Sequence, residues 1–404
     1  MPTLDQKEHS VSSQPAPPAR GFPRAEFVDR FQRAQQFMVE ARLDALLVTT
    51  PQQIRYFTGF DSQFWESPTR PWYVVLPVSG SGPIAVIPEI GAPGMAVTWV
   101  EDIRTWPAPR PDDDGVTLLS ETLREVAGSG GRVGAELGRE LSLRMPLNDL
   151  EAVRARSGVD VVDGTSVVRG CRHVKSELEI DRIRFVCSVA SASYAEVPNL
   201  YRRGDTERDV VQKYRRDVIA RGADTSPYLI GVAGPGGYDN IVMGPTDREI
   251  IEGDVLIIDT GTTYDGYFCD FDRNWAFGSP TAEVARAHQV VWDATEAGIA
   301  AATPGATVEE VWKAMDLVLT AGGSLGNNVG RLGHGLGLQL TEPPSNMPGD
   351  TTVLLPGTVL TIEPGMEFAP GRMMVHEENI VIREDGAELL TVRAPRDLPV
   401  IPWN

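Results

Sequence analysis

Residues 255–273 of the chain read VLIIDTGTTYDGYFCDFDR. The apolar run at the start predicts a buried strand that ends in Asp259, where a carboxylate is costly to bury without a partner or a cation. Asp270 follows eleven residues later, and Asp265 and Gly266 between them suit a hairpin turn. The stretch therefore predicts two strands that hold Asp259 and Asp270 side by side.

Three more polar residues close or interrupt apolar segments downstream. They are His334 in GHGLG, Glu363 in LTIEPG and Glu377 in VHEENI. Four carboxylates and one imidazole form a donor set that suits hard-to-borderline divalent ions, and bridging carboxylates can hold two such ions together. We therefore expect a site for two divalent metal ions, which would be manganese, iron, cobalt or zinc.

Composition limits the partners of this chain of 404 residues. Its 56 acidic and 37 basic side chains give a formal charge of -19, which repels phosphate backbones and anionic lipid. We expect no nucleic-acid or membrane partner, and a small-molecule substrate instead. No run of eighteen apolar residues occurs, the polar start does not resemble a secretory signal, and the three cysteines form no CxxC pair. These features favour a cytoplasmic protein.

The chain divides into three parts by pattern. Residues 1–22 are rich in Ser, Pro, Gln and Ala and predict a flexible tail or an arm that docks on a partner subunit. Residues 23–168 alternate between helical and strand patterns, which predicts an α/β domain with a mixed or parallel sheet. Residues 169–404 predict an α+β domain with a curved antiparallel sheet, whose first helix begins after Ser176 with acidic residues in its first turn.

The order of these motifs resembles that of a known group of enzymes. Asp-x10-Asp, then GHG, then EPG, then a Glu fourteen residues after the EPG Glu is the pattern of the pita-bread metallohydrolases, which include aminopeptidase P, prolidase and creatinase. Residues 43–60 resemble the creatinase/prolidase N-terminal domain, and residues 174–180 resemble the entry into the catalytic domain. The resemblance implies an α/β creatinase-like N-terminal domain followed by an α+β pita-bread catalytic domain.

The resemblance also implies a role for each motif residue. Asp259 would hold one metal ion, Asp270 and Glu377 would bridge both ions, and His334 and Glu363 would complete the shell of the other. A water molecule between the ions would be the nucleophile, and Glu363 would carry protons. The implied reaction is hydrolysis of a C–N bond in a small amide or dipeptide-like substrate.

Two positions depart from the pattern of the peptidases in this group. Those enzymes keep two histidines that are not ligands but bind the scissile carbonyl, and here Met243 and Thr341 occupy these positions, so we expect both to lie in the substrate-binding site. Neither side chain can act as an imidazole acid. His376 is the best remaining histidine for a catalytic role, although strand alternation points it away from the face that Glu377 uses. These changes lower the case for cleavage of proline peptides.

Asp272 is a further departure, since the group commonly has Thr there. Alternation places Asp272 on the same face as Asp270, where it could be an extra ligand, a general base or a partner of Arg273. Four alternatives stay open: a lyase that resembles dimethylsulfoniopropionate lyase, an enzyme like creatinase or ectoine hydrolase, a genuine Xaa-Pro dipeptidase or aminopeptidase, and a silent binding module. The complete ligand set argues against the last.

Aromatic residues suggest where a substrate would bind. The segment 60–73 is dense in aromatic side chains, and in related dimers this domain reaches over the partner's site. Trp65 and Trp72 could then cap a small substrate in a homodimer, or they could belong to an ordinary core. Tyr238, in the Gly-rich loop 234–240, could line the pocket.

Overall fold

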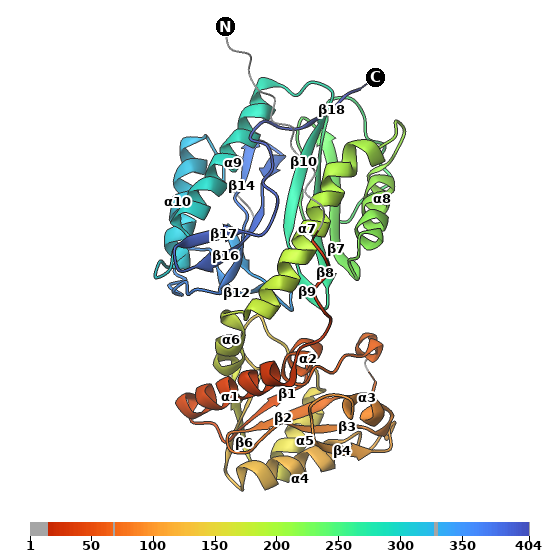
Figure 1. Ribbon diagram of the computed structural model, residues 1–404, viewed down its shortest axis with the longest axis vertical. Coiled ribbons are helices and arrows are strands. Elements are labelled where there is room, and N and C mark those ends of the chain that lie inside the picture. The colour runs from red at the N-terminus through yellow and green to blue at the C-terminus, as the bar shows by residue number, and fades with distance from the viewer. Residues whose placement is uncertain (1–14, 68, 327–329, 404) are drawn as a thin grey trace. The chain divides into compact units, whose positions relative to one another are not determined.

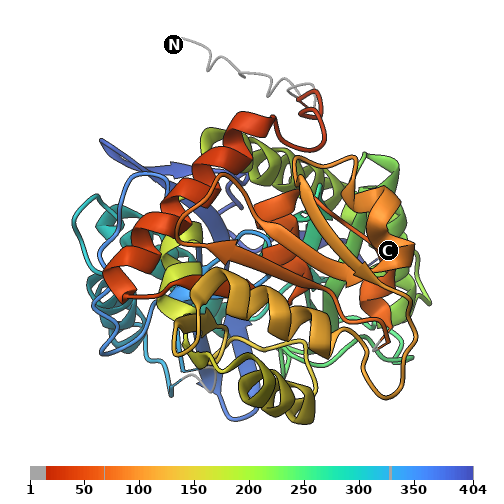
Figure 2. The ribbon, with the colours of Figure 1, turned by 90° about the horizontal axis from the view of Figure 1, so that it is seen from below.

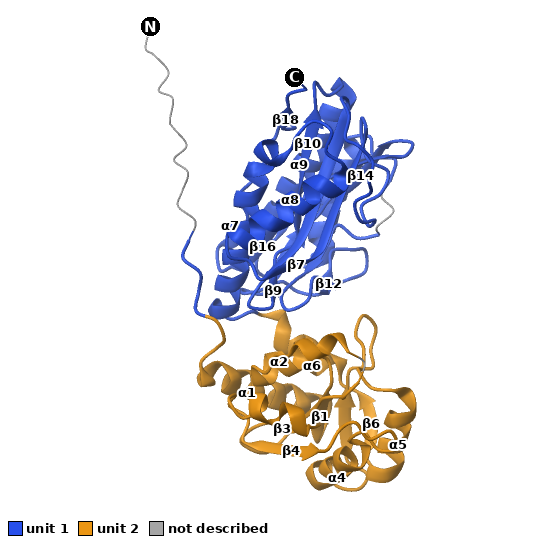
Figure 3. Ribbon diagram, turned by 90° about the vertical axis from the view of Figure 1, so that its right-hand side faces the viewer, with its two compact units in different colours: residues 1–19, 175–404 blue, residues 20–174 orange. Residues whose placement is uncertain are grey.

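The computed structural model describes residues 15–67, 69–326 and 330–403, and it forms two compact units (Figure 3). One unit comprises residues 20–174, and the other comprises residues 175–404 together with the segment that ends at Ala19. These divisions lie a few residues from the expected ones at 22/23 and 168/169. The expected flexible tail lies outside the described residues up to residue 14. Beyond it, the carbonyls of Pro18 and Ala19 accept hydrogen bonds from Tyr264 and Arg182.

The N-terminal unit contains a six-stranded mixed sheet in the order β4-β3-β2-β1-β5-β6. β2 is antiparallel to both β1 and β3, whereas the other neighbours are parallel, so the expected α/β class is confirmed. Figures 1 and 2 show α1 and α4 on opposite sides of this sheet. The strands are β1 (Ala45–Val48), β2 (Tyr73–Pro77), β3 (Ile84–Pro88), β4 (Asp102–Trp106), β5 (Arg132–Ala135) and β6 (Asp160–Asp163).

Helices of the N-terminal unit cover the sheet with apolar faces. In α4, for example, Leu119 and Leu123 lie one turn apart and pack with the sheet residues Leu47 and Val75 in one buried cluster. The helices are α1 (Arg24–Ala41), α2 (Pro51–Thr58), α3 (Ala92–Met95), α4 (Val116–Ala127), α5 (Leu147–Ser157) and α6 (Thr165–His173), with 3-10 turns η1 (Gln63–Glu66) and η2 (Glu89–Gly91).

The C-terminal unit is α+β, as expected, with two five-stranded sheets and a two-stranded ribbon. The first sheet has the order β18-β10-β8-β7, with β9 beside β8, and the second has the order β12-β11-β13-β16-β17. The pairs are antiparallel apart from β10 with β18. The strands are β7 (Thr225–Pro235), β8 (Asp254–Tyr264), β9 (Tyr267–Phe268), β10 (Phe271–Phe277), β11 (Gly333–Gly335), β12 (Glu342–Ser345), β13 (Val359–Ile362), β14 (Gly365–Ala369), β15 (Arg372–Val375), β16 (Glu378–Arg383), β17 (Gly386–Leu389) and β18 (Val400–Ile401).

Four helices flank these sheets (Figure 1): α7 (Glu177–Leu200), α8 (Glu207–Ala220), α9 (Ala282–Ala301) and α10 (Val308–Ala321). The Ser176 hydroxyl caps α7 by accepting from the Glu179 N–H, and the Glu179 carboxylate accepts from the Ser176 N–H in return, which fits the helix start expected from the sequence. No helix within the described ranges is long and apolar enough to cross a membrane.

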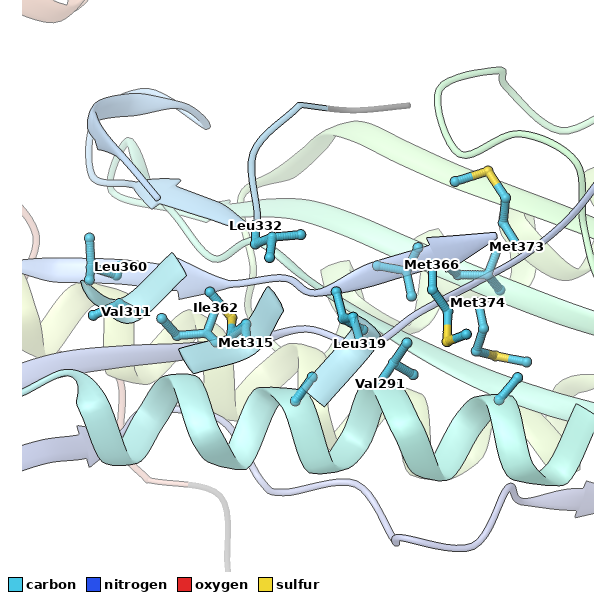
Figure 4. Close-up of a cluster of buried hydrophobic side chains, with 14 of the residues drawn as sticks. Val291, Val311, Met315, Leu319, Leu332, Leu360, Ile362, Met366, Met373 and Met374 are labelled. Atoms are coloured by element: carbon cyan, nitrogen blue, oxygen red, sulfur yellow. The ribbon is translucent and has the colours of Figure 1, made fainter. Parts of the chain in front are cut away.

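A buried apolar cluster between α9, α10 and the second sheet fixes the strand that directly precedes Glu363 (Figure 4). Leu360 and Ile362 of β13 point into this cluster, where Met315 of α10 also lies. Because a slip of one residue would turn both side chains out of the core, their burial sets the register of β13. That register determines where Glu363, the next residue, is placed.

Candidate metal centre

A hairpin of β8 and β10 places three carboxylates on one face. Asp272 lies directly opposite Asp259 in the antiparallel register, and Asp270 precedes β10 on the same alternation. The turn contains Asp265 and Gly266, both at positive φ, and Arg182 holds the Asp265 carboxylate at 2.8 Å. The sequence therefore predicted this hairpin correctly.

The structure brings the remaining motif residues to the same place. The ligand atoms of Asp259, Asp270 and Glu377 all lie within 4.8 Å of one another. The Nε2 atom of His334 lies 3.3 Å from Asp270 Oδ2 and 3.6 Å from Glu363 Oε2. Two groups of donors thus share Asp270, which is the arrangement that a bridging carboxylate requires.

Electrostatics shows that this cluster suits cations. Burial raises the pKa of Asp259, Asp270 and Glu377 well above the usual range, and mutual repulsion raises those of Asp259 and Glu377 further. Burial also raises the pKa of Glu363 to about 7. Asp259 Oδ1 and Glu377 Oε2 have no hydrogen-bond partner among the described residues. Divalent ions would neutralise these charges and occupy the unpartnered oxygens, so the donor set fits a metal centre.

The contacts of His334 would suit a metal ligand. Its Nδ1 donates to the Gly335 carbonyl at 2.8 Å, which leaves the lone pair on Nε2 facing the carboxylates. Burial lowers the pKa of His334, which favours the neutral ring. A Cβ at Gly333 would lie 2.3 Å from the Thr361 carbonyl oxygen and one at Gly335 would lie 2.5 Å from that of Pro343, so the backbone here requires glycine.

The sequence reasoning missed two residues that act on the candidate ligands. The Asn379 Oδ1 atom accepts from the Asp270 N–H at 2.9 Å, and its Nδ2 donates to the Asp270 carbonyl at 2.5 Å. The Tyr228 side chain on β7 lowers the pKa of Asp259 and so partly offsets the rise that burial causes. A buried Asn within an apolar strand, two residues after Glu377, was the available signal for Asn379.

Asp272 is fully buried beside the centre. Its Oδ1 accepts from Asn274 at 3.3 Å, whereas Oδ2 has no partner within the described part of the chain. Burial and repulsion from Asp259 raise the pKa of Asp272 well above its usual range. The guanidinium of Arg273 contacts Glu378 at 3.0 Å. The Arg273 charge still lowers the pKa of Asp272, and the three interpretations of Asp272 as a ligand, a general base or a partner of Arg273 stay predictions.

Three predicted site residues make other contacts in the structure. The Tyr238 hydroxyl is buried and donates to Asn274 Oδ1 at 3.1 Å, so this side chain supports β10, and its place in a substrate pocket stays a prediction. His376 lies between β15 and β16 and is also buried, and its Nδ1 contacts the Thr295 hydroxyl of α9 at 3.2 Å. Met243 is 61% exposed and lines a cavity of about 500 Å³ whose lining includes none of the five motif residues.

The other predicted substrate-binding residues have varied placements. Thr341 accepts a long hydrogen bond of 3.4 Å from Arg331, and the Arg331 Nε atom lies 3.8 Å from Glu363 Oε1. Trp72 is 1% exposed within the N-terminal unit, so it presents no surface to a substrate. Trp65 is half-buried in that unit and packs against Trp72 with ring centroids 5.6 Å apart.

The sequence of the chain is similar to those of known protein families and of named relatives. Residues 181–384 match the model of metallopeptidase family M24, and residues 30–174 match the creatinase/prolidase N-terminal domain. The chain is 32% identical to "Probable dipeptidase PepE" of Mycobacterium tuberculosis (strain ATCC 25618 / H37Rv), over 95% of this chain and 99% of that protein. It is 26% identical to an Xaa-Pro dipeptidase of Pyrococcus furiosus, over 90% of this chain and 97% of that one.

A solved structure of a named dipeptidase also resembles this chain. The crystal structure of dipeptidase PepE from Mycobacterium ulcerans superposes with a TM-score of 0.83 at 28% identity, over 95% of this chain and all of that chain. The chain belongs to metallopeptidase family M24. It is a metal-dependent hydrolase with a creatinase-type N-terminal domain, which confirms the resemblance seen in the sequence. The lyase and creatinase-like alternatives are not favoured by these relatives.

Proposed function

We propose that this hydrolase cleaves the amide bond of a dipeptide at a centre of two divalent metal ions. The observation that carries the proposal is the convergence of Asp259, Asp270 and Glu377 within 4.8 Å, with unpartnered oxygens on two of them. Relatives that are named dipeptidases support the substrate class. Oxygen-rich donors with one imidazole favour manganese, iron, cobalt or zinc.

The distances support one assignment of ligands. Asp259 would hold one ion, and His334 and Glu363 would hold the other. Asp270 and Glu377 would contact both ions, since Asp270 is close to Asp259 and Glu377 as well as to His334. When bound, two such ions lower the pKa of a water molecule and polarise a substrate carbonyl.

Glu363 is the residue best placed to move protons. Its side chain is 16% exposed, compared with 4% for His334 and 6% for Asp270, so a substrate can reach it. In this proposal a water oxygen bonds to the carbonyl carbon while the Glu363 carboxylate takes the released proton. The same proton then passes to the amide nitrogen as the C–N bond breaks.

A homodimer in the cytoplasm completes the proposal. Cys171, Cys187 and Cys269 are buried free thiols, which suits a reducing compartment. Of the two tryptophans, Trp65 stays available to cap a partner's substrate, because part of its side chain is exposed whereas Trp72 is buried. Sedimentation equilibrium of the full chain tests the dimer: a mass near twice 44.0 kDa is expected, and a monomer at micromolar concentration contradicts it.

A substrate panel tests the function. The protein is treated with chelator, reloaded separately with each of the four metals, and incubated with Ala-Pro, Ala-Ala, ectoine, creatine and dimethylsulfoniopropionate. We expect free amino acids from at least one dipeptide and none from the protein with Asp270→Ala. Asp247→Ala is the matched control, because Asp247 is an exposed residue that pairs with Arg208. Intact dipeptides together with turnover of another compound would contradict the proposal, as would full activity of Asp270→Ala.

A further inference from the structure

Arg331 places a positive charge at the accessible side of the metal centre. It lies just before β11, and its side chain is 29% exposed. The Nε atom lies 3.8 Å from Glu363 Oε1, and Nη2 donates to the Thr341 hydroxyl over a long 3.4 Å. Its Nη1 makes no hydrogen bond with any described residue. The guanidinium therefore has donors to offer to a ligand.

The charge of Arg331 acts on the centre itself. It lowers the pKa of Asp270 and of Glu363, against the effect of burial, so the charge interacts with both carboxylates. Arg273 is the other nearby guanidinium, but it is buried behind the cluster and binds Glu378 and the Glu377 carbonyl. Among the residues that the structure describes, Arg331 is thus the cation that faces the side a substrate would enter.

A count of charges shows what this cation does for the reaction. Ionised, the cluster carries five negative charges, and two divalent ions would bring four positive ones, leaving a net charge of -1. As water adds, the Glu363 carboxylate is neutralised by the proton while the carbonyl oxygen becomes negative, so the site keeps its net charge of -1 during the step. One guanidinium offsets that excess. The five carboxylates are Asp259, Asp270, Asp272, Glu363 and Glu377.

We propose that Arg331 is a further catalytic residue, whose guanidinium donates a hydrogen bond to the substrate carbonyl oxygen as negative charge develops there. The proposal rests on the amide hydrolysis proposed above. As water bonds to the carbonyl carbon, the π-electron pair moves to the carbonyl oxygen and the water proton moves to Glu363. When the C–N bond breaks, the pair re-forms the carbonyl and the proton leaves with the nitrogen. Arg331 stays protonated throughout.

The same guanidinium could instead bind a carboxylate at the end of the substrate, because its planar fork fits that group. The two roles predict different kinetics. A donor to the developing charge affects kcat, whereas an anchor for the substrate affects KM. An anchor would also matter less for a substrate whose C-terminus is amidated.

The experiment compares the metal-loaded wild type with Arg331→Met and Arg331→Lys, and with Arg208→Met as the surface control. Kinetics are measured on whichever of Ala-Pro and Ala-Ala is cleaved faster, and on its C-terminal amide. Calorimetry measures binding of the matching phosphinic analogue, which presents a tetrahedral anion. We expect Arg331→Met to lower kcat about 100- to 1,000-fold with KM within about threefold, and to weaken analogue binding by a similar factor. Arg331→Lys should recover part of both, and the metal content should be unchanged.

Two results would overturn the role of Arg331. One is an unchanged kcat with a raised KM only for the free-carboxylate dipeptide. The other is loss of bound metal in Arg331→Met, which would make Arg331 a structural residue. If the wild type cleaves no dipeptide, the proposed function fails. In that case the role of Arg331 is tested by binding alone: equal affinity of the wild type and Arg331→Met for the analogue would reject it.

Discussion

Asn379 holds the backbone of Asp270 from two sides, and its replacement should loosen the proposed bridging ligand. Asn379→Leu keeps an approximate side-chain volume but removes both hydrogen bonds, of 2.9 and 2.5 Å. The N–H and carbonyl of Asp270 would then be buried without partners. At about 1–3 kcal/mol for each group, the free energy of unfolding should fall by about 2–6 kcal/mol. This is a large part of the roughly 5–15 kcal/mol that a domain has.

Metal binding should weaken as well. Because Asp270 is proposed to contact both ions, a shift of its backbone disturbs both at once. Loss of a residue that orients a ligand typically costs about 10- to 100-fold in metal affinity. Competition with a chromogenic chelator measures this affinity, and urea unfolding of chelator-treated protein measures the stability term separately. Asn199→Leu is the control, since Asn199 is exposed at the end of α7. Metal affinity within about twofold of the wild type would refute the reasoning.

Three further outcomes are expected. Asp272→Asn removes a buried charge that faces Asp259, so the thermal midpoint of the chelator-treated protein should rise by about 2–4 °C per kcal/mol relieved, and calorimetry showing a fall would contradict this. Tyr238→Phe leaves the Val375 N–H without its partner and should cost about 1–3 kcal/mol in urea unfolding, whereas an unchanged midpoint would deny Tyr238 a supporting role. Without metal, Glu363 binds its proton more tightly in the folded state than in the unfolded state, because burial raises its pKa from 4.5 to about 7. Stability should be greatest below pH 4.5 for this group and fall by up to about 3 kcal/mol as the pH rises through 7, so a chelator-treated protein no less stable at pH 8 than at pH 5 would be contrary to expectation.

The gathering of the motif residues could be predicted because strand alternation and local spacing determine much of it. Asp259 and Asp270 are joined by one hairpin, so their proximity is a local property. Glu363 follows a strand whose apolar residues, Leu360 and Ile362, fix its register in the core.

The supporting residues could not be predicted, because their contacts join distant parts of the chain. Asn379 reaches Asp270 across 109 positions, and Arg331 reaches Glu363 through a pairing of neighbouring strands that spacing alone does not specify. The burial of Trp72 likewise depends on a neighbour: a Cβ at Gly91 would lie 1.9 Å from its ring, so this glycine makes the room that the indole fills. The sequence of an aromatic-rich segment therefore fits an exposed surface and a buried core equally well.

Anomalous diffraction from crystals of the manganese-loaded protein tests the central claim most directly. The account predicts two neighbouring peaks, one beside Asp259 and the other beside His334 and Glu363, with Asp270 and Glu377 in contact with both. A single peak, or peaks away from these five residues, would contradict the proposed two-metal centre.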